Sequence, residues 1–216
     1  MKGVKGELRK ILLEIKDRRF RRKVRVFMKK AFKRLEAEGN LSFFNAPAGR
    51  FQHHAYIGGL AEHTLATVRL ALAMVENLAK YYGVENVNRD YVVAGALLHD
   101  LYKPLTYRAE AEGGYGLSRV GSRLDHLTLL LAEAYKEGFP LDFLHVLAAS
   151  HGEWGPISPR TIEALIVHLA DLMDSRLAGE IQKAALNILK RKGETAVGEL
   201  NLREAAKIIW RAAEEL

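Results

Sequence analysis

The chain of 216 residues contains no cysteine. This absence excludes disulfide bridges, thiolate metal ligands and cysteine nucleophiles, so any bound metal must be held by nitrogen and oxygen atoms. Glutamine occurs only as Gln52 and Gln182, whereas Lys, Arg and Glu are abundant. This balance is typical of thermophilic proteins.

Long hydrophobic runs are also missing. No stretch of about eighteen apolar residues occurs, which argues against a membrane span. The N-terminus shows neither the apolar segment nor the cleavage site of a secretory signal, so we expect a cytoplasmic protein. With 49% hydrophobic residues the chain can bury one sizeable core, which predicts a single globular domain over residues 1–216.

The net charge of +7 is concentrated at one end of the chain. Residues 1–34 hold fifteen Lys or Arg and three acidic residues, a net charge of +12, while the remainder carries −5. One interpretation is a surface for RNA or single-stranded nucleic acid, whose binding would depend on salt. The other is the solvated face of a lysine-rich protein. The sequence leaves both open.

Apolar residues recur at helical spacing, strand signals are poor, and the pattern predicts an all-α fold. Residues 1–40 are interpreted as a basic helical arm of two helices, or one bent helix, ending near Gly39. Further helices are expected over about 60–82, 89–101, 122–138, 141–150, 159–190 and 199–215. Loops are expected over 41–58 and, with a small hairpin as the alternative, over 103–121. Ser158 is the expected N-cap of the helix over 159–190, with Pro159 in its first turn.

Ionisable residues occur inside the apolar helical segments. His99 and Asp100 close the apolar run 94–98, and Asp171 lies within the apolar run 166–173. An unpaired buried carboxylate costs several kcal/mol unless a cation compensates it. Two such carboxylates with nearby histidines indicate a shared divalent cation. The alternatives are hydrogen-bonded core histidines and an ion pair between Asp171 and Arg176.

The order of these residues resembles the HD superfamily of metal-dependent phosphohydrolases. The segment 51–64 reads FQHHAYIGGLAEHT and resembles HHAYIGGLLEHT, a signature of the branch with bacterial 3′→5′ exoribonucleases. Residues 97–104 read LLHDLYKP and are similar to ILHDIGK; residues 151–156 and 168–171 resemble HHGxxEWGSP and LHxxD. Two departures are the single His151 after Ser150, where relatives often have a histidine pair, and the helical arm where they carry an OB-fold.

This resemblance implies an HD-type helical bundle, with its core over 43–180 and C-terminal helices over 181–216. It implies a first metal site on His63, His99, Asp100 and Asp171. His126 and His151 would complete a second site that Asp100 bridges. Such ligands suit Mn²⁺, Fe²⁺, Co²⁺, Ni²⁺ or Zn²⁺, as one or two ions.

The implied reaction is hydrolysis of a phosphoester by a metal-activated water, with Asp100 and Lys103 as catalytic residues. Lys103 would hold a phosphate oxygen or stabilise the leaving group; the alternative is a solvated lysine at a helix end. His53, His54 and Trp154 are further candidates for substrate binding. The two histidines could equally orient metal ligands, and the tryptophan could be a packing residue.

Other polar residues are assigned supporting roles. His168 lies three residues before Asp171 on the same helical face. It is expected to contact and orient the metal ligands without binding the metal itself. Asp174 is at best another supporting group, and His145 is interpreted as structural.

The substrate stays open at this stage. A phosphoester, a nucleotide or RNA would fit a phosphodiesterase or nuclease. One alternative is a small-molecule cyclic phosphodiesterase or nucleotidase, and a second is a non-catalytic nucleic-acid-binding protein with a degenerate metal site. A homodimer is compatible with the long helices, although no heptad pattern is sustained enough to predict one.

Overall fold

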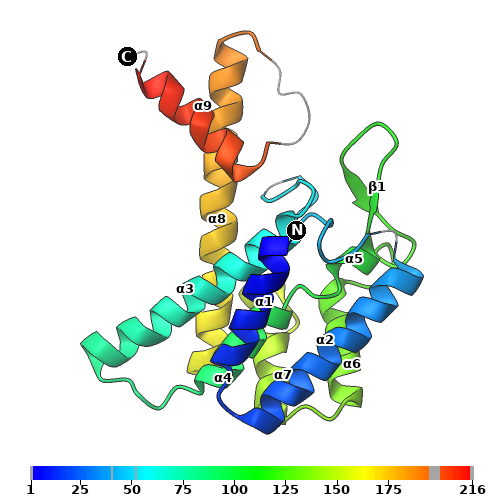
Figure 1. The fold of residues 1–216 in the computed structure, drawn as a ribbon, viewed down its shortest axis with the longest axis vertical. Helices are drawn as coiled ribbons and strands as arrows, with labels where there is room; N and C mark the ends of the chain where they lie inside the picture. Colours follow the sequence, from blue (N-terminus) through cyan, green and yellow to red (C-terminus); the bar gives the residue numbers. More distant parts are fainter. Residues whose placement is uncertain (1, 40, 52, 195–199, 215–216) are drawn as a thin grey trace.

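The computed structural model describes residues 2–39, 41–51, 53–194 and 200–214. Within these ranges the regular secondary structure is helical apart from one hairpin, which confirms the all-α prediction (Figure 1). The hairpin pairs β1, Tyr107–Ala109, antiparallel with β2, Tyr115–Leu117. None of the described helices is long and apolar enough to cross a membrane.

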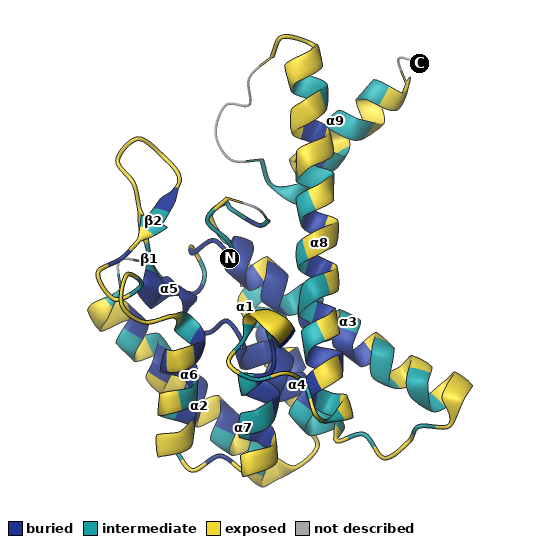
Figure 2. Cartoon of the chain, turned by 180° about the vertical axis from the view of Figure 1, so that it is seen from behind, coloured by how far each residue is buried: buried dark blue, intermediate teal, exposed yellow. Residues whose placement is uncertain are grey.

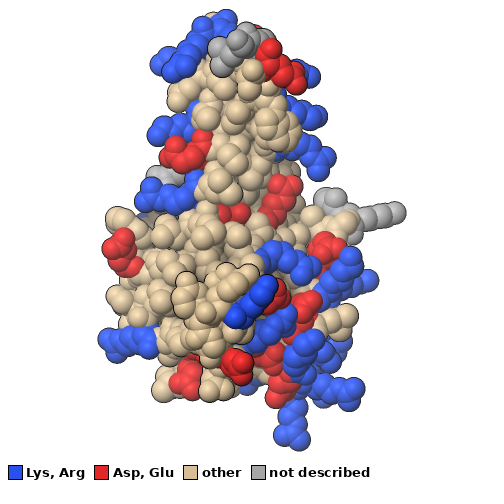
Figure 3. Space-filling model, turned by 90° about the vertical axis from the view of Figure 1, so that its left-hand side faces the viewer, with Lys and Arg blue, Asp and Glu red and all other residues tan. Residues whose placement is uncertain are grey.

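The basic N-terminal segment forms two helices, α1 (Lys2–Glu14) and α2 (Arg18–Glu38). The chain breaks between them because the Asp17 side chain caps α2, accepting hydrogen bonds from the backbone N–H groups of Arg19 and Phe20. Both helices pack on the core through apolar residues: Leu8, Ile11, Ile15, Val24, Phe27, Met28, Ala31 and Leu35. The basic side chains therefore lie on their outer faces. Figure 3 shows Lys and Arg gathered at the lower right of the view, among acidic residues, and again around the top.

Three helices, α3 (Gly59–Tyr82), α4 (Arg89–Leu98) and α8 (Ile162–Arg191), pack together at the centre of the bundle. Every residue of α4 from Val92 to Leu98 is buried (Figure 2). Gly95 allows the close packing of α4, since a Cβ atom there would lie 2.5 Å from Val146 Cγ1. Two shorter helices, α6 (His126–Lys136) and α7 (Leu141–Ala148), pack beside this centre.

Several helix boundaries differ from those expected. The prediction of Ser158 as N-cap is wrong: α8 begins at Ile162, because Thr161 Oγ1 accepts the N–H of Ala164 at 3.2 Å. The helix expected from about 122 begins at His126, where Asp125 provides the cap.

The helix expected to end near 101 stops at Leu98 and is followed by turns. In the segment expected to be a loop or hairpin, the one-turn helix α5 (Lys103–Thr106) precedes the hairpin. A short 3-10 helix, η1 (Gly152–Trp154), follows α7. The last helix, α9, covers Leu202–Glu214 and packs against the far end of α8, while residues 199 and 215 of the expected helix lie outside the described residues.

Candidate metal centre

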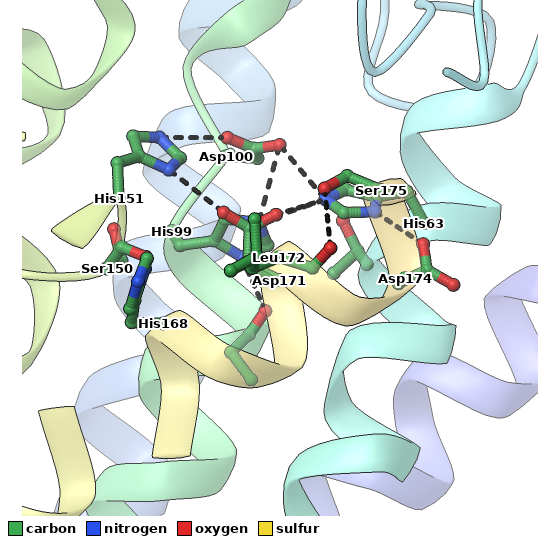
Figure 4. Close-up of polar contacts among 12 residues, drawn as sticks. His63, His99, Asp100, Ser150, His151, His168, Asp171, Leu172, Asp174 and Ser175 are labelled. Carbon is green, nitrogen blue, oxygen red and sulfur yellow. Dashed lines mark hydrogen bonds and ion pairs between the residues drawn. The ribbon is translucent and has the colours of Figure 1, made fainter. Parts of the chain in front are cut away.

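The six predicted metal ligands, though distant in sequence, meet at one point. His63 belongs to α3, and His99 with Asp100 follows the end of α4. His126 opens α6. His151 precedes η1, and Asp171 belongs to α8 (Figure 4). We call this group the metal centre: His63, His99, Asp100, His126, His151 and Asp171.

The first cluster of the metal centre is His63, His99 and Asp171. Nε2 of His63 lies 3.2 Å from Nε2 of His99 and 3.1 Å from Oδ1 of Asp171. Both imidazoles are fully buried. His99 donates from Nδ1 to the carbonyl of Ala96 at 2.9 Å, so Nε2 is the nitrogen that faces the cluster and would bind an ion.

The second cluster is Asp100, His126 and His151. Nε2 of His126 lies 2.8 Å from Nε2 of His151 and 3.1 Å from Oδ1 of Asp100. Nδ1 of His151 lies 3.0 Å from Oδ2 of Asp171, so this contact joins the two clusters. The second cluster is more open than the first, because the side chains of His126 and His151 are 16% and 19% exposed.

Asp100 lies between the two clusters. Its Oδ2 is 3.4 Å from His99 Nε2 and its Oδ1 is 3.1 Å from His126 Nε2. Both carboxylate oxygens are buried and neither accepts a hydrogen bond of regular geometry, although Nζ of Lys103 forms an ion pair with Oδ2 at 2.6 Å. Two nitrogens bound to one ion at 2.0–2.1 Å lie roughly 2.8–3.4 Å apart, as the facing imidazoles do here. The residues present therefore fit a divalent metal.

The charges of the centre are strongly coupled. Burial alone would raise the pKa of Asp100, but the charges of His99 and Lys103 lower it well below its ordinary value. Burial would lower the pKa of His99, but Asp100 and Asp171 raise it to about 10. For His126 burial prevails and lowers the pKa to about 4. Without metal, the first cluster therefore holds a proton in the place of a cation.

Lys103 is buried rather than solvated. It begins α5, only 7% of the residue is exposed, and its Nζ lies 2.6 Å from Oδ2 of Asp100. Its amide N–H donates to the Asp100 carbonyl at 3.0 Å, so the turn after α4 holds Lys103 at the metal centre although the helix has ended.

A cleft of about 1120 Å³ opens beside the metal centre, and His151 and Asp171 form part of its wall. His53, Trp154 and His168 also line it, and Trp154 is 82% exposed. The lining residues within the described ranges include none from α1 or α2. His168 contacts the carbonyl of Ser150 through Nδ1 at 3.2 Å, next to the predicted ligand His151.

His54 lies behind this wall, with 1% of the residue exposed. Its φ of 47° is the one positive value among the described residues other than glycine, and its Nδ1 lies 3.4 Å from Nδ1 of His53. Burial lowers the pKa of His53 to about 3 and that of His54 to about 4. Both imidazoles are therefore neutral near pH 7. His145, by contrast, lies outside both clusters and accepts the backbone N–H of Arg160 at 3.0 Å.

The sequence did not reveal how closely Asp174 approaches the centre. Its Oδ2 lies 2.6 Å from Nδ1 of His63, and only 7% of the residue is exposed. The sequence offered one indication of this, which is that Asp174 follows Asp171 by three residues on one helix. This spacing places both carboxylates on one side of α8. Which partner that side meets depends on the packing of α8 against α3.

Comparison with known proteins gives consistent matches. The HD domain model matches residues 60–176. The dihydroneopterin 2′,3′-cyclic phosphate phosphodiesterase of Methanocaldococcus jannaschii is 44% identical over 170 residues, which cover 78% of this chain and 68% of that protein. The 3′-5′ exoribonuclease YhaM of Listeria innocua is 32% identical over 182 residues, which cover 79% of this chain and 53% of that protein. The chain thus spans about half the length of that exoribonuclease. No solved structure matches significantly.

Proposed function

Since this chain belongs to the HD domain family of metal-dependent phosphohydrolases, we propose that it hydrolyses a phosphodiester bond at the metal centre. The observation that carries this proposal is Asp100, a buried carboxylate that contacts a histidine of each cluster. A bound divalent ion, Mn²⁺, Fe²⁺, Co²⁺, Ni²⁺ or Zn²⁺, would lower the pKa of a water molecule and neutralise phosphate oxygens. The number of ions, one or two, is part of the proposal.

Each residue at the cleft receives a role in this proposal. Asp100 bridges the two clusters, and the Lys103 ammonium beside it binds a phosphate oxygen or stabilises the leaving oxygen. His53 and Trp154 contact the substrate from the cleft wall. His54 supports His53 from behind, and His168 supports His151 through the Ser150 backbone.

The preferred substrate class is a small cyclic phosphodiester attached to a flat heterocycle. The relative at 44% identity acts on a 2′,3′-cyclic phosphate of a pterin. The exposed Trp154 offers a ring face for stacking within the cleft. Because α1 and α2 do not line the cleft, their positive charge is not required to bind such a compound.

RNA is the second candidate substrate. The exoribonuclease relatives favour it, and Arg50, Arg176 and Lys183 line the cleft that leads along α8 to the metal centre. The outer faces of α1 and α2 would then hold a distant part of the strand through its phosphates. The non-catalytic alternative is disfavoured because the ligands of both clusters are present.

A homodimer also belongs to the proposal. Five apolar residues follow one another along α8 at three- and four-residue spacing, each at least 40% exposed: Ile162, Leu165, Leu169, Met173 and Leu177. Such a stripe suits a second helix. That the protein is cytoplasmic, and that it functions at high temperature, both stay predictions from the sequence.

The test is a metal add-back assay on chelator-treated protein, with Mn²⁺, Fe²⁺, Co²⁺, Ni²⁺ and Zn²⁺ in separate reactions. The substrates are bis-p-nitrophenyl phosphate, a purine nucleoside 2′,3′-cyclic phosphate and single-stranded RNA. We expect metal-dependent hydrolysis of the cyclic phosphate above that of RNA. Faster turnover of RNA would select the nuclease, and no hydrolysis of any substrate with any metal would refute the proposed function.

A further inference from the structure

One turn of α8 contacts both ring nitrogens of a single buried imidazole. Oδ1 of Asp171 lies 3.1 Å from Nε2 of His63, and Oδ2 of Asp174 lies 2.6 Å from Nδ1 of the same ring. Figure 4 shows the two carboxylates on opposite sides of the imidazole. His63 has no exposed surface, so its ring cannot exchange either partner for water.

The two contacts determine which nitrogen of His63 carries the proton. A carboxylate only accepts hydrogen bonds, so the short contact to Asp174 requires a proton on Nδ1. Nε2 faces His99, Asp100 and Asp171, so in the form protonated on Nδ1 alone its lone pair is directed at the metal centre. This is the tautomer that a metal ligand requires.

Asp174 has one further partner among the described residues, which is His54. Nε2 of His54 lies 3.7 Å from Oδ2 of Asp174. His54 in turn faces His53, which lines the cleft. The carboxylate therefore lies between the ligand His63 and the turn that carries the cleft histidines.

We propose that Asp174 is a positioning residue of the metal centre: it holds His63 in the Nδ1-protonated form and joins that ligand to the His53–His54 turn. This inference rests on the proposed function only in assuming that the centre binds metal. Asp174 itself contacts neither substrate nor metal in this account. Carboxylates that orient metal-bound histidines typically strengthen metal binding by about 10- to 100-fold.

The variants Asp174→Ala and Asp174→Asn test this role by metal affinity, measured as Co²⁺ binding to chelator-treated protein with its visible absorption spectrum. We expect Asp174→Ala to weaken binding by about 10- to 100-fold and to change the Co²⁺ spectrum. Asp174→Asn should weaken binding less, because its amide oxygen can still accept from Nδ1. The rate of hydrolysis should return to within a few-fold of wild type at saturating metal.

The matched control is Asp142→Asn, since Asp142 is an exposed carboxylate at the start of α7. It should bind Co²⁺ like the wild type. If Asp174→Ala does not fold, the nearly isosteric Asp174→Asn decides, with the melting temperature of each metal-free variant as the check. Unchanged affinity in a folded Asp174 variant, or a lost rate that saturating metal does not restore, would overturn the inference. A wild-type protein that binds no metal would refute the proposed function instead.

Discussion

The two clusters of the metal centre have similar ligands and different surroundings. His63 and His99 have no exposed surface, whereas the side chains of His126 and His151 are 16% and 19% exposed, and His151 lines the cleft. The pKa of His99 is raised to about 10 by two carboxylates, while burial lowers that of His126 to about 4. The difference suggests a division of labour, in which the first cluster retains an ion permanently and the second meets the substrate.

The largest effect is expected at Asp100, whose carboxylate contacts a histidine of each cluster. Asp100→Asn replaces a bridging carboxylate by a neutral amide, so both clusters lose charge at once. We expect the rate of bis-p-nitrophenyl phosphate hydrolysis to fall by at least about 10³-fold. The bound metal, measured on the same sample, should fall as well. Retention of the full rate by a folded variant would remove Asp100 from the mechanism.

A smaller and unequal effect is expected when one histidine is removed from each cluster. His99→Ala should abolish activity nearly as completely as the Asp100 variant, because the buried cluster cannot recruit water as a ligand easily. His151→Ala should lower the rate by about 10- to 100-fold, since the first cluster remains complete. Rates and metal content of the two variants, measured in parallel, check this order. Equal losses would show that the clusters act as one unit.

Proton release on metal binding distinguishes the two clusters in the wild-type protein. His99, with a pKa raised to about 10, is protonated at pH 7 in the metal-free protein, so an ion at the first cluster must displace that proton. His126, with its pKa lowered to about 4, has none to lose. Calorimetric titration in buffers of different ionisation enthalpy should show proton release with the first ion and weaker binding at lower pH. Binding without proton release would contradict the assigned charge of His99.

The smallest effect is expected on the outer face of α2. Replacing Arg18, Arg25 and Lys29, all exposed, by glutamine should leave hydrolysis of bis-p-nitrophenyl phosphate within about twofold of wild type. If these residues hold RNA, its affinity should fall, with a shallower salt dependence by about one unit per lost phosphate contact. Fluorescence anisotropy of a labelled RNA at several salt concentrations measures this. Unchanged RNA binding would support the solvated-face interpretation.

The sequence predicted the elements of this fold better than their ends. Periodicity is a property of ten or more residues, so α3 and α8 were evident, whereas a boundary depends on one side chain. The choice between Ser158 and Thr161 as N-cap illustrates this, because both are good capping residues and only the chain path decides. The helical character of residues 1–39 was likewise recognised, but the choice between two helices and one bent helix depends on the cap at Asp17.

The site shows a similar limit. The resemblance to the HD superfamily pointed to the residues that the structure brings together, because that family's ligands follow one another in the same order along the chain. The partner of Asp174 could not be predicted, since it requires the relative rotation of α3 and α8, a property of the packed core. The burial of Lys103 also depends on tertiary structure, because α4 ends before it and the following turn directs its side chain to Asp100.

The most direct test of the central claim is to load chelator-treated wild-type protein with Mn²⁺ in steps, measuring bound metal and the rate of bis-p-nitrophenyl phosphate hydrolysis at each step. The account predicts no activity without metal and a rate that rises with metal bound at the centre, with no such rise in His99→Ala. Full hydrolysis by metal-free protein in the presence of chelator would contradict it.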